Sequence, residues 1–227
     1  MDSSVETVTP LPVRLALPDV VLDGDLALPA EARGLVIFAH GSGSSRHSPR
    51  NRAVAEVLQH GRLGTLLLDL LTQREELADA ATAEFRFNIP LLADRLVASI
   101  DWARAHPQTS QLPVGLFGAS TGAAAALIAA ARRPRVVGAV VSRGGRPDLA
   151  DESLDAVSAP TLLIVGGRDD VVVALNEQAL ARLKEPKRLE IVPGATHLFE
   201  EAGALDHVSR LAKRWFDAAL TRDRQPR

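Results

Sequence analysis

A serine between two glycines stands where an apolar segment meets an alanine-rich one. The segment Val114-Gly115-Leu116-Phe117-Gly118-Ala119-Ser120-Thr121-Gly122-Ala123 contains the pattern Gly-x-Ser-x-Gly. On a sharp turn from strand to helix, such a serine exposes Oγ above the sheet, and small flanking residues let the backbone cross itself. The positive end of the helix then favours the anion that forms in acyl transfer. The alternative is a tight turn in which Ser120 only caps the helix, but the flanking strand and helix favour a nucleophile.

A serine hydroxyl needs a neighbouring base to accept its proton near pH 7. His197 follows the last apolar run of the sequence, where a loop can reach back to the serine turn, so we expect it to be the base. His40 ends an earlier strand, and we expect it to orient the loop that follows. Surface positions are expected for the other four histidines, which are His47, His60, His106 and His207.

The imidazole in turn needs a carboxylate that fixes its tautomer and stabilises its protonated form. Asp169 and Asp170 follow the apolar run 161–165 directly. We choose Asp169 because it falls at the first turn beyond the strand, while Asp170 stays an alternative. Both could instead cap the next helix. The chain order is then serine, aspartate, histidine.

A glycine- and serine-rich loop, His40-Gly41-Ser42-Gly43-Ser44-Ser45, follows the strand 35–39. Acyl transfer needs two amide groups that donate to the developing oxyanion. We assign these to Thr121 and Ser42, with Gly43 as the alternative to Ser42. The loop lacks the patterns of phosphate-binding and dinucleotide-binding loops, so nucleotide binding is not expected.

Short apolar runs alternate with segments of helical period, which predicts an α/β fold with a doubly wound, mostly parallel sheet. The first two of about eight strands have alternating character and predict an N-terminal antiparallel hairpin. Helices are expected after Ser48, from about Pro90, after Thr121, around 175–183 and around 208–219. The mixed, charged stretch Leu71–Asn88 is predicted to be a functional loop. The predicted strands are 13–17, 20–28, 35–39, 64–70, 114–117, 136–141, 161–165 and 188–192.

Composition limits the class of protein. The 227 residues carry a formal net charge of −2 with both signs interspersed, which argues against nucleic-acid binding. The absence of cysteine excludes a disulfide framework, a thiolate zinc site and a cysteine nucleophile. Residues 1–6 do not resemble a secretory signal, and the apolar runs are too short to span a bilayer, so a cytoplasmic protein without membrane partners is expected. We expect one domain over 1–220 and a frayed tail over 221–227.

Taken together, these motifs resemble the α/β-hydrolase superfamily, and within it the dienelactone-hydrolase-like branch. The resemblance extends from Leu35 through the last predicted helix. It implies hydrolysis of carboxylic esters with small or medium acyl groups through an acyl-enzyme, with no metal or organic cofactor. Dienelactone hydrolases proper use a cysteine nucleophile, whereas Ser120 occupies that position here, which favours an ordinary ester substrate. Similar hydrolases also occur beside phosphoribosyltransferase domains, and none is expected in this chain.

The resemblance also bears on the substrate site. Many relatives carry a helical cap after the sixth strand, but 142–160 is too short for one, so an open site is expected. Gly43 is expected to touch substrate. Arg143 could bind a substrate carboxylate, or form a salt bridge that pins its loop. An apolar wall is expected from residues that could equally be plain core, namely Leu71, Phe85, Phe87, Leu198 and Phe199.

Two other functions compete with an esterase. Thioester hydrolysis or acyl transfer could use the same residues, and a series of ester and thioester substrates would separate them. A non-catalytic ligand-binding protein of this fold usually lacks one member of the triad, whereas all three are expected here. The partner is therefore expected to be a small ester, with the protein a monomer or homodimer.

Overall fold

The structure is a computed structural model that describes residues 8–220. Its eight strands form one sheet in the order β1-β2-β4-β3-β5-β6-β7-β8. β1 and β2 form an antiparallel hairpin, β2 is also antiparallel to β4, and every other neighbouring pair is parallel. The predicted doubly wound sheet with an N-terminal hairpin is confirmed. The strands are β1 (Leu11–Ala16), β2 (Val21–Ala27), β3 (Leu35–Ala39), β4 (Gly64–Leu68), β5 (Val114–Ala119), β6 (Val137–Arg143), β7 (Thr161–Gly166) and β8 (Lys187–Val192).

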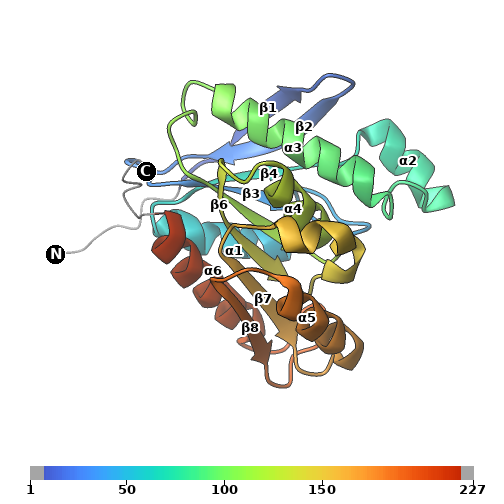
Figure 1. Cartoon of the computed structure of the whole chain (residues 1–227). Coiled ribbons are helices and arrows are strands. Elements are labelled where there is room, and N and C mark those ends of the chain that lie inside the picture. The colour runs from blue at the N-terminus through green and yellow to red at the C-terminus, as the bar shows by residue number, and fades with distance from the viewer. Residues whose placement is uncertain (1–7, 221–227) are drawn as a thin grey trace.

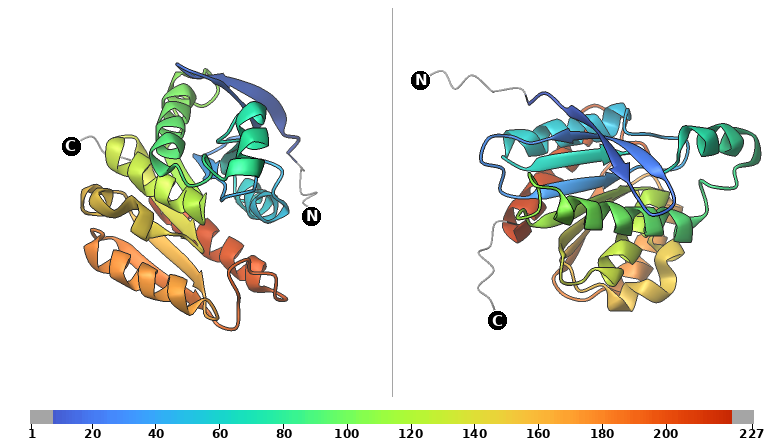
Figure 2. Two further views of the ribbon diagram at one scale, coloured as in Figure 1. Left: turned by 90° about the vertical axis from the view of Figure 1, so that its right-hand side faces the viewer. Right: turned by 90° about the horizontal axis from the view of Figure 1, so that it is seen from above.

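Helices cover both faces of this sheet (Figure 1). α1 (Pro49–His60) and α6 (Ala204–Leu220) lie on one face, and α3 (Ile89–Ala105), α4 (Thr121–Arg132) and α5 (Asp170–Arg182) lie on the other (Figure 2). Each face has its own apolar core. Because both faces are covered, β3, β4, β5 and β7 are buried along their whole length, which explains their unbroken apolar sequences.

One helix was not predicted. α2 (Gln73–Thr82) forms inside the stretch 71–88, which we expected to be a loop. A capping box starts it, since the Glu75 amide donates to Thr72 Oγ1 (3.3 Å) and the Thr72 amide donates to Glu75 Oε2 (2.8 Å). α2 stands apart from both helix layers, at one end of the sheet (Figures 1 and 2). The stretch predicted to be a functional loop is therefore partly helical, because the Thr72-x-x-Glu75 capping box begins a helix inside it.

Strand ends differ from prediction by one or two residues, and one difference has a clear cause. β4 stops at Leu68, although the apolar run continues to Leu70. The Leu70 amide donates to His40 Nε2 (3.0 Å) rather than to a neighbouring strand. β5 and β6 run two residues further than predicted, to Ala119 and Arg143, where they pair with each other.

The connection between β6 and β7 is short. It holds a 3-10 helical segment, η1 (Pro147–Ala156), and the described part of the chain has no cap domain. No helix within residues 8–220 is long and apolar enough to cross a membrane. The tail expected over 221–227 lies outside the described residues.

Candidate active site

Ser120 is the single residue between the end of β5 and the start of α4. Its backbone angles, φ 50° and ψ −120°, lie in a region that side-chain-bearing residues rarely adopt. Neighbouring backbone holds it there: the Ser120 amide donates to the Arg143 carbonyl (3.2 Å), and its carbonyl accepts from the amides of Ala123 (3.1 Å) and Arg146 (3.2 Å). The strained turn is therefore fixed by the elements on both sides of it.

Two glycines allow the strand and helix to cross at this turn. A Cβ on Gly122 would lie 2.3 Å from the Ala39 carbonyl oxygen, and a Cβ on Gly118 would lie 2.4 Å from the Ala123 Cα. Both contacts are with backbone, which cannot turn away as a flexible side chain could. Any larger residue at either position would push α4 away from the end of β3 or β5.

His197 and Asp169 meet across the loops that follow β8 and β7. His197 Nδ1 lies 2.7 Å from Asp169 Oδ2. Asp169 occupies the N-cap position of α5, yet its side chain makes no capping hydrogen bond. Asp170, the sequence alternative, is the exposed first residue of the helix. The carboxylate in contact with the imidazole is that of Asp169.

This contact determines what the imidazole can do. If Nδ1–H donates to the carboxylate, the opposite nitrogen, Nε2, is left to accept a proton. The His197 side chain is 39% exposed and that of Asp169 is 19% exposed. The pair is therefore open on the imidazole side and more enclosed on the carboxylate side, as a base that exchanges protons with substrate requires.

The loop after β3 forms a turn beside the start of α4. The Ser44 amide donates to the Gly41 carbonyl (3.2 Å), and Gly43 has φ +65° at the third position of this turn. Ser42 Oγ donates to the Arg86 carbonyl (3.3 Å) and lies 3.1 Å from Thr121 Oγ1. Ser42 and Thr121, whose amides we assigned to one anion, are thus joined by a side-chain hydrogen bond.

His40 fastens this loop to the end of β4. Its Nε2 accepts from the Leu70 amide, so Nδ1 carries the proton and donates to the Gly41 carbonyl (2.9 Å). Burial lowers the pKa of His40, and this effect outweighs the Gly41 hydrogen bond and the charge of Asp69. The ring is therefore neutral, with both nitrogens occupied.

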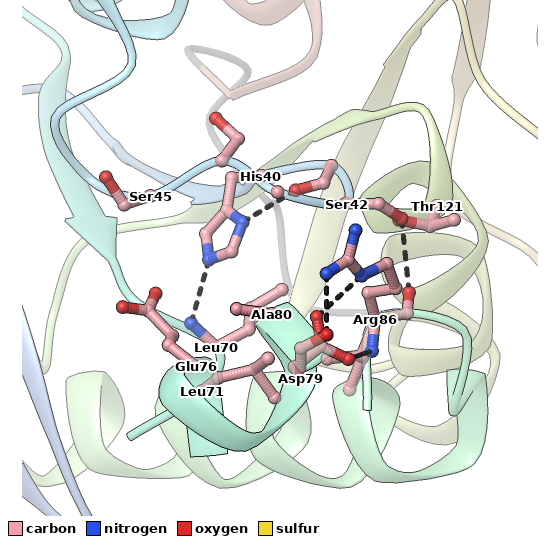
Figure 3. A pocket seen from close by; sticks show the side chains of 14 residues that line it. His40, Ser42, Ser45, Leu70, Leu71, Glu76, Asp79, Ala80, Arg86 and Thr121 are labelled. Atoms are coloured by element: carbon pink, nitrogen blue, oxygen red, sulfur yellow. Dashed lines mark hydrogen bonds and ion pairs between the residues drawn. The ribbon is translucent and has the colours of Figure 1, made fainter. Parts of the chain in front are cut away.

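A cavity of about 320 Å³ adjoins this loop (Figure 3). Its wall includes four residues named from the sequence, Ser42, Gly43, Leu71 and Thr121. Three charged residues for which the sequence predicted no role also line it, namely Glu76, Asp79 and Arg86. All three come from 71–88, the stretch predicted from its length to be functional. The Thr72-x-x-Glu75 capping box is the signal that would have placed Glu76 and Asp79 on a helix.

Asp79 and Arg86 are joined by several hydrogen bonds in the cavity wall, an arrangement called here the Asp79–Arg86 clamp. Asp79 Oδ1 accepts from the amides of Phe85 (2.8 Å) and Arg86 (2.9 Å), and Oδ2 accepts from Arg86 Nε (2.6 Å). Arg86 Nη2 donates to the Asp79 carbonyl (2.7 Å). Burial acts to raise the pKa of Asp79, but these hydrogen bonds outweigh it and lower the pKa. The clamp fixes the carbonyl that accepts from Ser42.

The expected apolar wall is only partly present. Leu71 lines the cavity, but Phe199 is 2% exposed and belongs to the core between α6 and the sheet. Phe85 packs against the core of the other face. Phe87 and Leu198 are exposed, at 60% and 39%. Of the five expected wall residues, only Leu71 lines this cavity. Phe199 is a core residue, and a role in substrate binding for Phe85, Phe87 and Leu198 stays a prediction.

Arg143 is buried at the end of β6, and among the described residues its guanidinium forms neither a hydrogen bond nor an ion pair. The salt bridge considered as an alternative is therefore absent from this part of the chain. Burial, and then the like charge of Arg50, lower the pKa of Arg143 to about 10.

Comparison with known proteins shows the family and supports the fold. The model of the Dienelactone hydrolase family matches residues 28–220. The chain belongs to this family. A dienelactone hydrolase from Anabaena variabilis has the same fold at a TM-score of 0.93 and 58% identity, over 95% of this chain and 100% of that one. The chain thus has the α/β-hydrolase fold.

More distant structures share the fold of the family. XC6422 from Xanthomonas campestris, described as an α/β serine hydrolase without a lid, matches at a TM-score of 0.74 and 20% identity, over 94% of this chain and 96% of that one. A Mycobacterium tuberculosis protein provisionally named a phosphoribosyl transferase is 58% identical over 90% of this chain and 45% of its own length. The chain therefore spans about half the length of this curated relative.

Proposed function

We propose that the protein hydrolyses carboxylic esters of small or medium acyl groups, with Ser120 as nucleophile, His197 as base and Asp169 as the residue that orients His197. Ser120 Oγ attacks the acyl carbon while its proton passes to His197 Nε2. The imidazolium then protonates the leaving alcohol, and water releases the acyl group by the same route in reverse. The amides of Ser42 and Thr121 stabilise the oxyanion at each step.

The observation that carries this proposal is the conformation of Ser120. Ser120 is strained, and the strand-to-helix crossing that holds it requires a glycine on each side. A serine that only capped the helix would not need this conformation or its cost in free energy. The hydrogen bond from His197 to Asp169 supports the same assignment, because it orients an imidazole for proton transfer.

Kinetics on p-nitrophenyl esters test the proposal. Ser120→Ala should lower ester turnover by about three orders of magnitude or more while the melting temperature stays close to that of the wild type. A variant that retains most of its activity would rule out this role for Ser120. A parallel series of thioesters and acceptor alcohols measures whether esters are the preferred substrates.

Arg143 remains a candidate for binding a substrate carboxylate. Its buried guanidinium has no acceptor among residues 8–220, and its carbonyl accepts from the nucleophile's amide. Arg143→Ala should then slow the turnover of anionic esters more than that of neutral ones, and equal losses would reject this role. The cytoplasmic location expected from the sequence also stays a prediction.

A further inference from the structure

The cavity beside Ser42 and Thr121 is placed to receive one part of an ester. If the carbonyl oxygen of the substrate lies on the amides of these two residues, the acyl chain has this cavity next to it. The apolar part of the wall comes from Leu70, Leu71 and Leu92. A volume of about 320 Å³ is at the lower end for ligand sites, which suits an acyl chain of modest size.

Most charges at this cavity are already compensated. Arg86 and Asp79 neutralise each other within their clamp. Asp69, behind the wall, pairs with Arg46, which also lies near Asp25. The His40 ring is neutral, because burial lowers its pKa and both nitrogens are hydrogen-bonded.

Glu76 is the exception. It comes from α2 and lines the cavity, and among the described residues its carboxylate has no hydrogen bond and no ion pair. Figure 3 shows it at the opposite end of the cavity from Thr121. Burial, and then the charges of Asp69 and Asp79, raise the pKa of Glu76, against the opposing effect of Arg46.

We propose that this cavity is the acyl subsite and that Glu76 makes it prefer acyl groups that end in a cation over those that end in an anion. The proposal rests on the ester hydrolase function proposed above. A cationic end would supply the partner that Glu76 lacks. An anionic end would meet a like charge, and the described residues that line the cavity include no unpaired cation to offset it. Since Glu76 is exposed, solvent screens the effect, and a preference of about fivefold to tenfold over a neutral group is expected.

Three p-nitrophenyl esters of similar length measure this preference, with acyl groups 4-(trimethylammonio)butanoyl, 5,5-dimethylhexanoyl and 4-sulfobutanoyl. Their charges are permanent, so pH does not change them. For the wild type, kcat/KM should fall in the order cationic, neutral, anionic. Glu76→Gln should bring the three values close together, because it removes the charge and keeps the shape. Added salt should reduce the wild-type preference.

Glu84→Gln is the matched control, since Glu84 is an exposed carboxylate just after α2 that does not line the cavity. It should keep the wild-type order. Equal cation-to-anion ratios in Glu76→Gln and wild type, or equal losses in both variants, would overturn the proposal. Hydrolysis of the neutral ester without any charge preference would overturn the role of Glu76 and leave the esterase function standing. Failure to hydrolyse any of the three would count against both.

Discussion

At the scale of single residues, Asp169 stands at the N-cap position of α5, but its carboxylate does not cap the helix. An aspartate at an N-cap usually accepts from the first amides of its helix. Here that carboxylate accepts from His197 instead, and the start of α5 is left without a side-chain cap. We interpret this as helix stability given up for the orientation of the imidazole.

Asp169→Asn tests this interpretation. An amide in place of the carboxylate no longer stabilises the imidazolium and can hold the wrong tautomer, so kcat should fall by about 10² to 10⁴-fold. Asp170→Asn, one residue further, should leave kcat close to the wild-type value. Steady-state kinetics of the two variants, with melting temperatures as a check on folding, make the comparison. A larger loss of kcat in Asp170→Asn than in Asp169→Asn would contradict the assignment and point to Asp170 as the residue that orients His197.

At the scale of elements, a partly buried ion pair between Glu75 and Arg95 joins α2 to α3. Arg95 of α3 donates to both carboxylate oxygens of Glu75 (2.5 and 2.7 Å) and to the Leu70 carbonyl (2.7 Å). The side chains are 7% and 20% exposed. Burial acts to raise the pKa of Glu75, but the hydrogen bonds from Arg95 and Thr72 outweigh it and lower the pKa to about 2.

Glu75→Gln should therefore destabilise the fold. It leaves the buried Arg95 guanidinium with the Leu70 carbonyl but without a counter-charge, and the free energy of unfolding should fall by about 3 kcal/mol. In the wild type this contribution is complete above the ordinary pKa of a glutamate and is lost as the pH falls toward about 2, because the folded-state pKa is the lower one. Urea unfolding at several pH values measures both effects. Glu76→Gln, on the same helix, is the control, and a similar loss there would refute this role of the ion pair.

The sequence predicted most strands and the serine turn, but not α2 or the cavity beside it. Strands such as β5 and β7 were predicted because burial on both faces requires unbroken apolar runs. The serine turn was predicted because the close crossing of strand and helix requires glycines on both sides of the serine, and they are adjacent in the sequence. The cavity could not be predicted, since Ser42 and Arg86 are 44 residues apart and meet only once α2 has formed. Phe199, which the sequence suggested as a wall residue, is instead part of a hydrophobic core, and its apolar side chain alone could not distinguish the two roles.

At the scale of the whole molecule, two separate cores share one sheet. Trp102 of α3 packs against the core on the α3–α4 face, and Trp215 of α6 packs against the core on the α1–α6 face. The chain has two tryptophans, so each face has its own fluorescent probe. Neither core can persist without the strands, which contribute side chains to both.

We therefore expect both faces to unfold together. Trp102→Phe and Trp215→Phe each leave one tryptophan, and their urea transitions, followed by fluorescence, should coincide with the transition that circular dichroism reports for the same variant. A fluorescence transition that clearly precedes the loss of secondary structure in either variant would mean that one helix layer separates first.

Labelling with a fluorophosphonate tests the central claim most directly, because the probe reacts only with a serine whose proton is removed by a base. Peptide mass spectrometry of the wild type should find one adduct, on Ser120. Labelling should be far slower in His197→Ala and absent in Ser120→Ala. A folded wild-type protein that takes up no probe, or takes it up on a different residue, would contradict the account.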